Sequence, residues 1–241
     1  MTGYFVIVDG LDGSGKGVVV DALKEYSEKQ GKKIFDLREY CKENHRFPEP
    51  EELNGYDVIV SAEPTYCFVG EAIRKEIVRE NSNIYSALTT AHAFALDREI
   101  LYKKIIIPCL KQGKTIFQER GVITSLVYQP VQMERLSLHD IINLPGNKLA
   151  IHNAPHLLII TKVSPDVVMQ RLSKREKKDT AIFEKLHFQR KIESRYESEW
   201  LKKLFEDFRS KVIYLDTNPP KSVEDTKQEA VRVFEEAKPS P

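Results

Sequence analysis

Central to this chain is the stretch Gly10-Leu11-Asp12-Gly13-Ser14-Gly15-Lys16, which matches the first seven positions of the phosphate-binding loop pattern G-x-x-x-x-G-K-[ST]. Before it, Tyr4–Val8 is a continuous apolar run rich in β-branched residues, as in a buried parallel strand. After it, Val18–Gln30 carries apolar residues near helical spacing, and Gly31 is a natural helix stop. The stretch therefore lies where a strand turns into a helix.

A strand, a glycine-rich loop, a lysine and a helix in this order indicate a site for nucleotide phosphates. The glycines let backbone N–H groups face phosphate oxygens, the helix N-terminus adds a partial positive charge, and Lys16 adds a full one. This combination argues against the alternative, a glycine-rich turn without a ligand. The candidate phosphate-binding residues are Gly10, Leu11, Asp12, Gly13, Ser14, Gly15, Lys16 and Gly17.

One position departs from the pattern. Gly17 and then Val18 follow the lysine, so the hydroxyl that normally meets Mg²⁺ is missing. A water molecule can take the place of that hydroxyl, and a glycine in the first turn of a helix costs little stability. We therefore keep the prediction of a phosphate site.

Composition restricts the class of protein. The 241 residues allow one large domain or a domain with appended lids, and a net charge of +1 favours neither nucleic acid nor a membrane surface as a partner. Cys41, Cys67 and Cys109 show no C-x-x-C spacing, so we expect reduced thiols instead of disulfides or a zinc site. No apolar run is long enough to span a membrane, and a strand begins almost at the first residue. We expect a cytoplasmic protein.

Strands and helices alternate along the chain, which predicts an α/β fold with a parallel sheet and helices on both faces. The candidate strands are Tyr4–Val8, Ile34–Leu37, Asp57–Ser61, Thr115–Gln118, Leu157–Val163 and Val212–Asp216. We expect a single domain over residues 1–241, with a surface insertion at 38–56 that forms a solvated loop, a basic lid at about 171–187, and a frayed tail at 238–241.

Two further segments carry candidate site residues. Phe94 and Arg98 are four residues apart on a long helical pattern, so they share one helix face, where an aromatic ring and a guanidinium suit a flat base with polar edges. Glu119 and Arg120 come at the carboxyl end of a predicted buried strand, where binding loops of such sheets lie. Taken singly, Phe94 is more typical of an ordinary core aromatic. For Glu119 and Arg120, a surface ion pair is the less favoured alternative, because charged residues at the end of a buried strand are unusual unless they face a site.

Together these motifs resemble the thymidylate kinase family of nucleoside-monophosphate kinases. The resemblance covers most of the chain, in order and at sensible spacing. The matching segments are Val8–Lys16, Ala62-Glu63-Pro64, Gly70-Glu71-Ala72-Ile73-Arg74, Phe94-Ala95-Leu96-Asp97-Arg98, Glu119-Arg120, Ser125-Leu126-Val127-Tyr128-Gln129 and the basic stretch Arg171–Tyr196.

The resemblance implies a fold and a reaction. The fold is the P-loop NTPase type, three layers α/β/α around a central, mainly parallel five-stranded sheet with a helical lid. The reaction is transfer of the γ-phosphoryl group of ATP to dTMP, with Mg²⁺ as cofactor and a homodimer as a possible assembly. An acceptor phosphate is already ionised, so the reaction needs positioning and positive charge and no general base. The six histidines therefore have no predicted role.

The resemblance also implies residue roles. Lys16, Arg171 and Arg175 neutralise the transferring phosphoryl group, since the loop itself holds no arginine. Asp12 meets the sugar 3′-hydroxyl or orients the loop, and Arg120 holds the acceptor phosphate. The implied acceptor site consists of Phe94, Arg98, Arg120, Ser125, Tyr128, Gln129, Arg74 and Glu63. Phe94 stacks on thymine, Arg98 binds the base edge, Tyr128 excludes a ribose 2′-hydroxyl, and Ser125 and Gln129 line the pocket. No metal ligand is certain, and Asp9 and Glu119 are candidates that act through water.

Two departures from the family pattern leave alternatives open. Ala62 stands where the family has an arginine for the acceptor phosphate, and Arg74, Arg38 and Arg46 are candidate replacements. Glu119 stands in place of an aspartate, and Glu-Arg here is also similar to deoxynucleoside kinases. One alternative is a kinase with another acceptor, either a different monophosphate or a deoxynucleoside whose 5′-hydroxyl an acid near Asp9 or Glu119 deprotonates. The other is a non-catalytic nucleotide-binding protein.

Overall fold

The computed structural model describes residues 3–78, 83, 85–131, 136–173 and 182–238. In this part of the chain, six strands form one sheet in the order β2-β3-β4-β1-β5-β6, and every neighbouring pair is parallel. The strands are β1 (Tyr4–Gly10), β2 (Ile34–Asp36), β3 (Val58–Ala62), β4 (Thr115–Glu119), β5 (Leu157–Lys162) and β6 (Lys211–Asp216). The expected parallel α/β sheet is confirmed.

The expected number of five strands is wrong, because the sheet has six. All six candidate strands of the sequence are present, each within two residues of its expected ends. The outer two are β2 and β6, and β6 pairs with β5 from Leu157↔Lys211 to Lys162↔Asp216. An edge strand needs only one partner, so a short or half-exposed run such as β6 can join the sheet without the continuous apolar pattern of a central strand.

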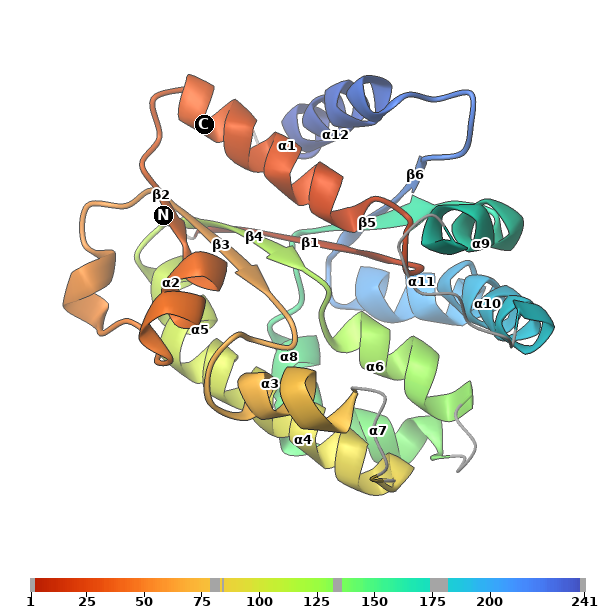
Figure 1. The fold of residues 1–241 in the computed structure, drawn as a ribbon. Coiled ribbons are helices and arrows are strands. Elements are labelled where there is room, and N and C mark those ends of the chain that lie inside the picture. The colour runs from red at the N-terminus through yellow and green to blue at the C-terminus, as the bar shows by residue number, and fades with distance from the viewer. Residues whose placement is uncertain (1–2, 79–82, 84, 132–135, 174–181, 239–241) are drawn as a thin grey trace.

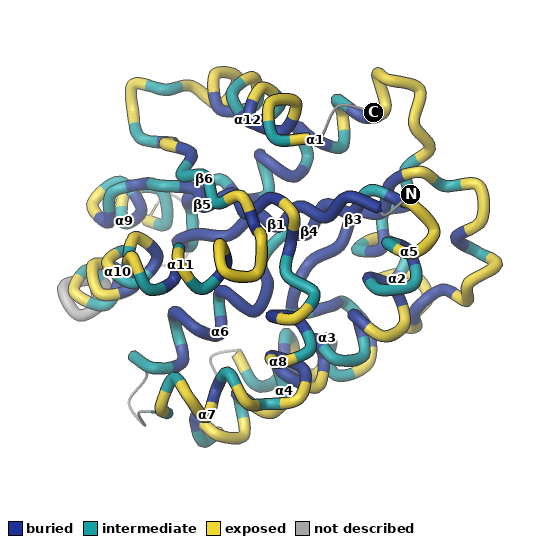
Figure 2. Tube along the Cα trace, turned by 180° about the vertical axis from the view of Figure 1, so that it is seen from behind, coloured by how far each residue is buried: buried dark blue, intermediate teal, exposed yellow. Residues whose placement is uncertain are grey.

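Strand β1 runs through the middle of the sheet and is buried along its whole length. Successive side chains of a strand face opposite sides. Tyr4, Val6 and Val8 accordingly join one apolar cluster, while Phe5 and Ile7 join the other. Figure 2 shows the central strands as a buried layer, with the exposed residues on the surrounding helices and loops. The continuous apolar run of β1 thus reflects burial from both faces.

The helices cover both faces of the sheet. On one face lie α1 (Lys16–Lys29) and α12 (Val223–Ala237), which pack against each other, and most of the others lie on the opposite face or at its end (Figure 1). The remaining α-helices are α2 (Leu37–Asn44), α3 (Phe68–Ala72), α4 (Ala87–Leu101), α5 (Ile107–Lys111), α6 (Val122–Tyr128), α7 (Leu138–Asn143), α8 (Pro145–His152), α9 (Pro165–Ser173), α10 (Ile182–Tyr196) and α11 (Glu199–Asp207). The shorter helical turns are η1 (Pro50–Leu53), η2 (Ile73–Ile77), η3 (Tyr102–Ile106) and η4 (Gln129–Val131).

The long helical pattern after Tyr85 forms three consecutive pieces. Ser86 begins α4 because its side chain accepts a hydrogen bond from the backbone N–H of Thr89. The π-helical turn η3 then leads into α5, where Pro108 lies in the first turn. The wider π-helical turn directly before it accommodates the proline, which cannot donate a hydrogen bond to the preceding turn. The continuity of these pieces holds Phe94 and Arg98 in a fixed position under the sheet.

Residues 38–56 do not form the solvated loop that we expected. The segment contains most of α2 and the turn η1, and three of its apolar side chains, Cys41, Phe47 and Leu53, are buried in the core. Lys114 fixes its far end, because its ammonium group donates to the backbone carbonyls of Leu53 and Tyr56 at 3.0 and 2.6 Å. The polar residues of 38–56 therefore lie on the outer side of a segment whose apolar residues pack in the core.

No described helix has the length and the apolarity needed to cross a bilayer. Of the expected tail at 238–241, only Lys238 lies within the described residues, directly after α12.

Candidate active site

The candidate site lies where the three neighbouring strands β3, β4 and β1 end. The register pairs Glu119 with both Val8 and Ala62, so the loops that follow the three strands begin side by side. These loops contain the glycine-rich stretch, Glu63-Pro64 and Arg120. Ligands of open parallel sheets bind at this edge, and the sheet thereby brings together motifs that are far apart in the sequence.

The glycine-rich stretch has the geometry of a phosphate loop. Gly10, Gly13 and Gly15 adopt φ angles of 143°, 77° and 92°, which residues with a Cβ atom rarely adopt. The Lys16 ammonium is only 4% exposed and donates to the carbonyls of Gly10 at 3.0 Å and Leu11 at 2.6 Å. Burial, together with the nearby charge of Arg120, lowers the pKa of Lys16 to about 8. The loop thus holds a cation that is poorly hydrated.

Asp9 ties this loop to the rest of the site. Its carboxylate is fully buried and accepts hydrogen bonds from Thr124 Oγ1 at 2.8 Å, Tyr196 Oη at 2.8 Å and the backbone N–H of Gly121 at 3.2 Å. The N–H of Gly10 is a further donor at 2.8 Å. Both carboxylate oxygens are therefore occupied by protein donors, which indicates a positioning role for Asp9.

Arg120 joins the loop to the neighbouring strand end. Its guanidinium forms an ion pair with Asp12, which is part of the phosphate loop. Its backbone has a φ of 63°, which is uncommon for a residue other than glycine. Two contacts hold it there: its N–H donates to Val8 O at 2.8 Å, and its carbonyl accepts from Gln118 Nε2 at 2.9 Å. Backbone strain of this kind concentrates at functional sites.

A cavity of about 440 Å³ opens beside this ion pair, within the size range of small-molecule sites. It is lined by Asp12, Pro64, Arg74, Val78, Thr90, Phe94, Arg120, Thr124, Ser125, Tyr128 and Gln129. Six of the predicted acceptor residues line it directly, namely Phe94, Arg120, Ser125, Tyr128, Gln129 and Arg74. The cavity therefore combines an aromatic ring, two guanidinium groups and several neutral polar groups.

Of the three arginines considered as replacements for one at position 62, Arg74 is the one that lines the cavity. Its Nε donates to the carbonyls of Pro64 at 2.9 Å and Thr65 at 3.1 Å. Its guanidinium carbon lies 3.8 Å from the centre of the Tyr66 ring, and burial lowers the pKa of Arg74. The other two candidates are occupied elsewhere, because Arg38 pairs with Asp36 and Asp21, and Arg46 pairs with Glu52.

Arg98 and Glu63 lie behind the cavity and not in its wall. They form a buried ion pair at 2.6 Å, with exposed fractions of only 1% and 3%. Arg98 also donates to Asn147 and, at 3.3 Å, to Ser125 Oγ. Burial raises the pKa of Glu63, and the charge of Arg98 opposes this shift. In this structure Arg98 reaches the cavity through Ser125, which differs from the direct contact with a base that we expected.

Gln129 carries a polar atom without a partner. Among the described residues, Gln129 Oε1 is buried and accepts no hydrogen bond. Leaving such a group unpaired is costly unless a ligand or water completes it. Gln129 lines the cavity, and so does Tyr128, whose hydroxyl interacts with Arg120. The site is therefore prepared to exchange hydrogen bonds with a polar ligand.

Sequence comparison identifies the family. The sequence profile of the family described as thymidylate kinase matches residues 51–230, well over half of the chain. The chain belongs to the thymidylate kinase family. Members of this family are nucleoside-monophosphate kinases, so the chain is an ATP-dependent phosphotransferase, as the sequence predicted.

Relatives of known family agree with this assignment. The thymidylate kinase of Caldicellulosiruptor saccharolyticus is 30% identical over 192 residues, which are 80% of each chain. That of Thermoanaerobacter sp. is 27% identical over 220 residues, which are 90% of each chain. The crystal structure of thymidylate kinase from Ehrlichia chaffeensis superposes with a TM-score of 0.64 at 19% identity, covering 97% of this chain and all of the other. This last likeness concerns the fold alone.

The basic lid of a thymidylate kinase is described here only in part. Arg171 lies on α9 and donates to the carbonyls of Gly13 at 3.1 Å and Thr217 at 2.6 Å, so it fastens the phosphate loop to the strand β6 region. Arg175, the second predicted lid arginine, lies outside the described residues. The assignment of both to the phosphoryl group stays a prediction.

The sequence reasoning missed several residues that complete this thymidylate kinase site. Thr124 and Tyr196 hold Asp9, Asn147 accepts from Arg98, and Thr90 lines the cavity. Thr124 immediately precedes the recognised Ser125 segment, which is a usable signal. Asn147 and Tyr196 are distant in sequence from their partners and carry no local signal.

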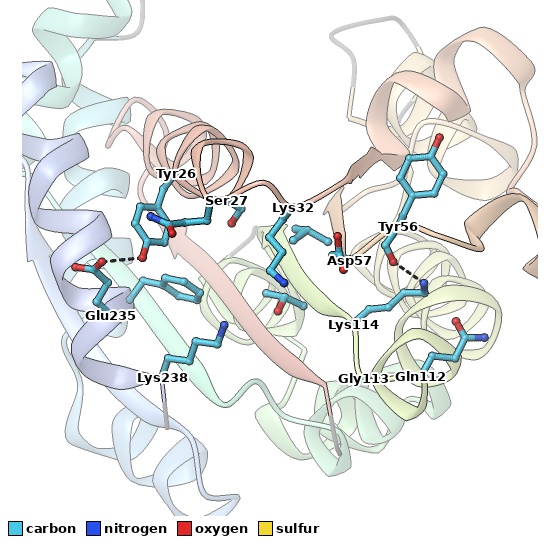
Figure 3. A pocket seen from close by; sticks show the side chains of 14 residues that line it. Tyr26, Ser27, Lys32, Tyr56, Asp57, Gln112, Gly113, Lys114, Glu235 and Lys238 are labelled. Carbon is cyan, nitrogen blue, oxygen red and sulfur yellow. Dashed lines mark hydrogen bonds between the residues drawn. The ribbon is translucent and has the colours of Figure 1, made fainter. Parts of the chain in front are cut away.

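A larger cavity, of about 730 Å³, lies at the opposite edge of the sheet (Figure 3). Its lining comes from the last part of α1 and the residues after it, from the residues around the starts of β3 and β4, and from the end of α12, including Tyr26, Asp57, Lys114 and Glu235. The Lys114 ammonium points to the carbonyl of Tyr56, and the Tyr26 hydroxyl donates to Glu235 at 2.7 Å. None of the predicted site residues that the structure describes lies here, so size does not identify the active site.

Proposed function

We propose that this chain transfers the γ-phosphoryl group of ATP to dTMP and forms dTDP and ADP. The single observation that carries the proposal is the ion pair between Asp12 and Arg120, because Asp12 belongs to the phosphate loop and both residues line the acceptor cavity. Donor and acceptor phosphates bound on the two sides of this pair would be neighbours. In-line phosphoryl transfer requires this proximity more than it requires acid–base chemistry.

On the donor side, the loop amides and Lys16 bind the β- and γ-phosphates of ATP. The ammonium group of Lys16 exchanges its contacts with the carbonyls of Gly10 and Leu11 for phosphate oxygens. Because the group is buried, its charge acts on the phosphates with little screening by water. Arg171 keeps the loop in position through Gly13, and Arg175 supplies a further charge to the phosphoryl group.

On the acceptor side, Phe94 stacks on the thymine ring, and Gln129 reads its edge. Thymine carries a donor at N3, and the unpaired Oε1 of Gln129 is a buried acceptor. Cytosine carries an acceptor at N3, so the same atom disfavours it. Arg98 donates a hydrogen bond to Ser125 and so positions this side chain in the cavity wall. Tyr128 narrows the space beside the sugar.

Arg74 and Arg120 hold the acceptor phosphate. Both guanidinium groups line the cavity, and each is held by fixed protein contacts, Arg74 by backbone carbonyls and Arg120 by Asp12. Two preorganised arginines favour a phosphorylated acceptor over a free deoxynucleoside. This is the observation that separates our proposal from the nucleoside-kinase alternative.

Mg²⁺ fits this site through Glu119. A Cβ built on Gly17 lies 3.6 Å from Glu119 Oε2, so the acidic side chain borders the position where the missing hydroxyl would be. Among the described residues, the Glu119 carboxylate has neither a hydrogen bond nor an ion pair in the structure, whereas that of Asp9 has four protein donors. Glu119 would therefore hold the ion, directly or through water. When bound with ATP, Mg²⁺ neutralises the phosphate oxygens.

The experiment is a coupled ADP-release assay with ATP and Mg²⁺. The acceptors to compare are dTMP, dUMP, dCMP, dGMP, UMP and thymidine. We expect turnover with dTMP, weaker turnover with dUMP, and none with thymidine. The Gln129→Leu variant should raise the KM for dTMP by about 10- to 100-fold and leave the KM for ATP unchanged, because only the acceptor loses a hydrogen bond.

Other outcomes would select the alternatives. Turnover with thymidine would identify a nucleoside kinase, and turnover with another monophosphate would change the acceptor. ATP binding without turnover of any acceptor would identify a non-catalytic nucleotide-binding protein. A homodimer and a cytoplasmic location, both expected from the sequence, stay predictions that gel filtration and cell fractionation can check.

A further inference from the structure

Two of the three cysteines lie in contact. Cys41 belongs to α2, and Cys67 follows the loop after β3 and caps the start of α3. Their sulfur atoms are 3.1 Å apart, with the Cys67 thiol donating to Cys41 Sγ. A disulfide bond is about 2.05 Å long, so the two atoms are only about 1 Å from bonding distance.

The surroundings of this pair are closed. Cys41 is 1% exposed and Cys67 is fully buried, and both are free thiols in the structure. The hydrogen bond from Cys67, together with burial, raises the pKa of the Cys41 thiol. Cys109, on α5, is equally buried, but it has no sulfur partner in the part of the chain that the structure describes. It is therefore a matched control within the same protein.

We propose that Cys41 and Cys67 form a reversible disulfide that fastens α2 to the loop after β3. The oxidant is a small-molecule disulfide such as oxidised glutathione. Because the pair is closed, exchange takes place during local opening of this segment. The Cys67 thiolate then attacks the oxidant, forming a mixed disulfide and releasing one glutathione thiolate. The Cys41 sulfur then displaces the second glutathione. The S–S bond of glutathione breaks, the protein S–S bond forms, and the two thiol protons pass to the two glutathione thiolates.

The bond would hold a segment that the site depends on. Between β3 and Cys67 lie Pro64, which lines the acceptor cavity, and Thr65, whose backbone N–H and hydroxyl donate to Asp97 at 2.8 and 2.6 Å. The Thr65 hydroxyl also lies 3.1 Å from the carbonyl of Cys67. Since the sulfur atoms are already in contact, the bond can close with little movement of the two sulfur atoms. We therefore expect a stabilising bond and not an inhibitory one.

The test uses the full-length chain without nucleotide, so its result does not depend on the proposed activity. The reduced protein is incubated with oxidised glutathione over hours, because buried thiols exchange slowly. Remaining thiols are then alkylated under denaturing conditions, and the chain is digested for mass spectrometry. We expect a peptide linked through Cys41 and Cys67, with Cys109 alkylated. The Tm should rise by roughly 5–10 °C and return on reduction.

Variants separate the bond from a general effect of the oxidant. Cys41→Ser and Cys67→Ser should each lose the rise in Tm, while Cys109→Ser should keep it. If a serine variant does not fold, the linked peptide of the unmodified chain still decides the question. Three alkylated cysteines after oxidation, a link that includes Cys109, or a stable glutathione adduct on Cys41 or Cys67 would each overturn the proposal.

Discussion

At the scale of single residues, the site contains charged groups that water hardly reaches. Lys16 is nearly buried within the phosphate loop, and Arg98 and Glu63 form an ion pair behind the acceptor cavity. Removing one member of a buried pair leaves the other uncompensated, which costs more than the pair contributes. Such groups therefore act as fixed charges, set in place before a ligand arrives.

The pKa of Lys16 leads to a prediction about ATP binding. Below a pKa of about 8 the ammonium group is charged and attracts phosphates, and above it the neutral amine does not. The Kd for ATP should therefore rise by about eightfold between pH 7.5 and 9, which calorimetry can measure. In Lys16→Arg, whose guanidinium stays charged, the Kd should change little with pH. A constant Kd for the unmodified protein over this range would contradict the assignment.

At the scale of elements, the acceptor cavity depends on how closely α4 and α8 approach. Gly146, in the first turn of α8, faces the backbone of α4, and a Cβ on it would lie 1.8 Å from the carbonyl oxygen of Ala95. The next residue, Asn147, accepts a hydrogen bond from Arg98. The absence of a side chain at position 146 is therefore what lets α8 support the helix that carries Phe94.

The Gly146→Ala variant tests this contact. The added methyl group has no room, so the two helices must separate. We expect the free energy of unfolding to fall by about 2–3 kcal/mol, the Tm to fall by about 4–12 °C, and the KM for the acceptor to rise. Lys148→Ala, on the exposed side of the same helix, should change stability by less than about 0.5 kcal/mol. Equal effects of the two changes, measured by thermal unfolding, would argue against close packing at Gly146.

At the scale of the whole molecule, the carboxyl ends and the amino ends of the parallel strands form two different edges, each with its own cavity. The loops after β1, β3 and β4 build the candidate site at one edge (Figure 1), while the larger cavity of Figure 3 lies at the other. Helix α1 begins at the first edge and ends at the second, so its N-terminus faces the phosphate loop. Within the described part of the chain, only the first edge combines a helix N-terminus with converging strand ends.

A pair of variants tests which edge is active. The double substitution Lys32→Ala/Lys238→Ala, in the large cavity, should leave kcat/KM within about twofold, since surface changes away from the site affect catalysis little. Lys16→Ala, at the other edge, should lower kcat by at least about 100-fold through loss of charge at the phosphates. Steady-state kinetics measures both. A large loss in the double variant would place a function in the second cavity.

The features that the sequence determined by itself are those that depend on local patterns. The phosphate loop follows from glycine spacing and a lysine, and all six strands follow from short apolar runs that need burial. Phe94 could be predicted as a site residue because its motif is contiguous on one helix, and it does line the acceptor cavity. The five-stranded sheet that the family resemblance implied was one strand short, because joining an edge depends on a partner strand and not on the run itself.

Tertiary structure alone decided the pairings between distant residues. Glu63 meets Arg98 35 positions away, and Tyr196 meets Asp9 187 positions away. The packing of the elements also places Arg98 behind the cavity wall, and it places Cys41 in contact with Cys67. The physical reason is that burial and the pairing of charges depend on which elements pack together, and no local pattern of residues contains that information.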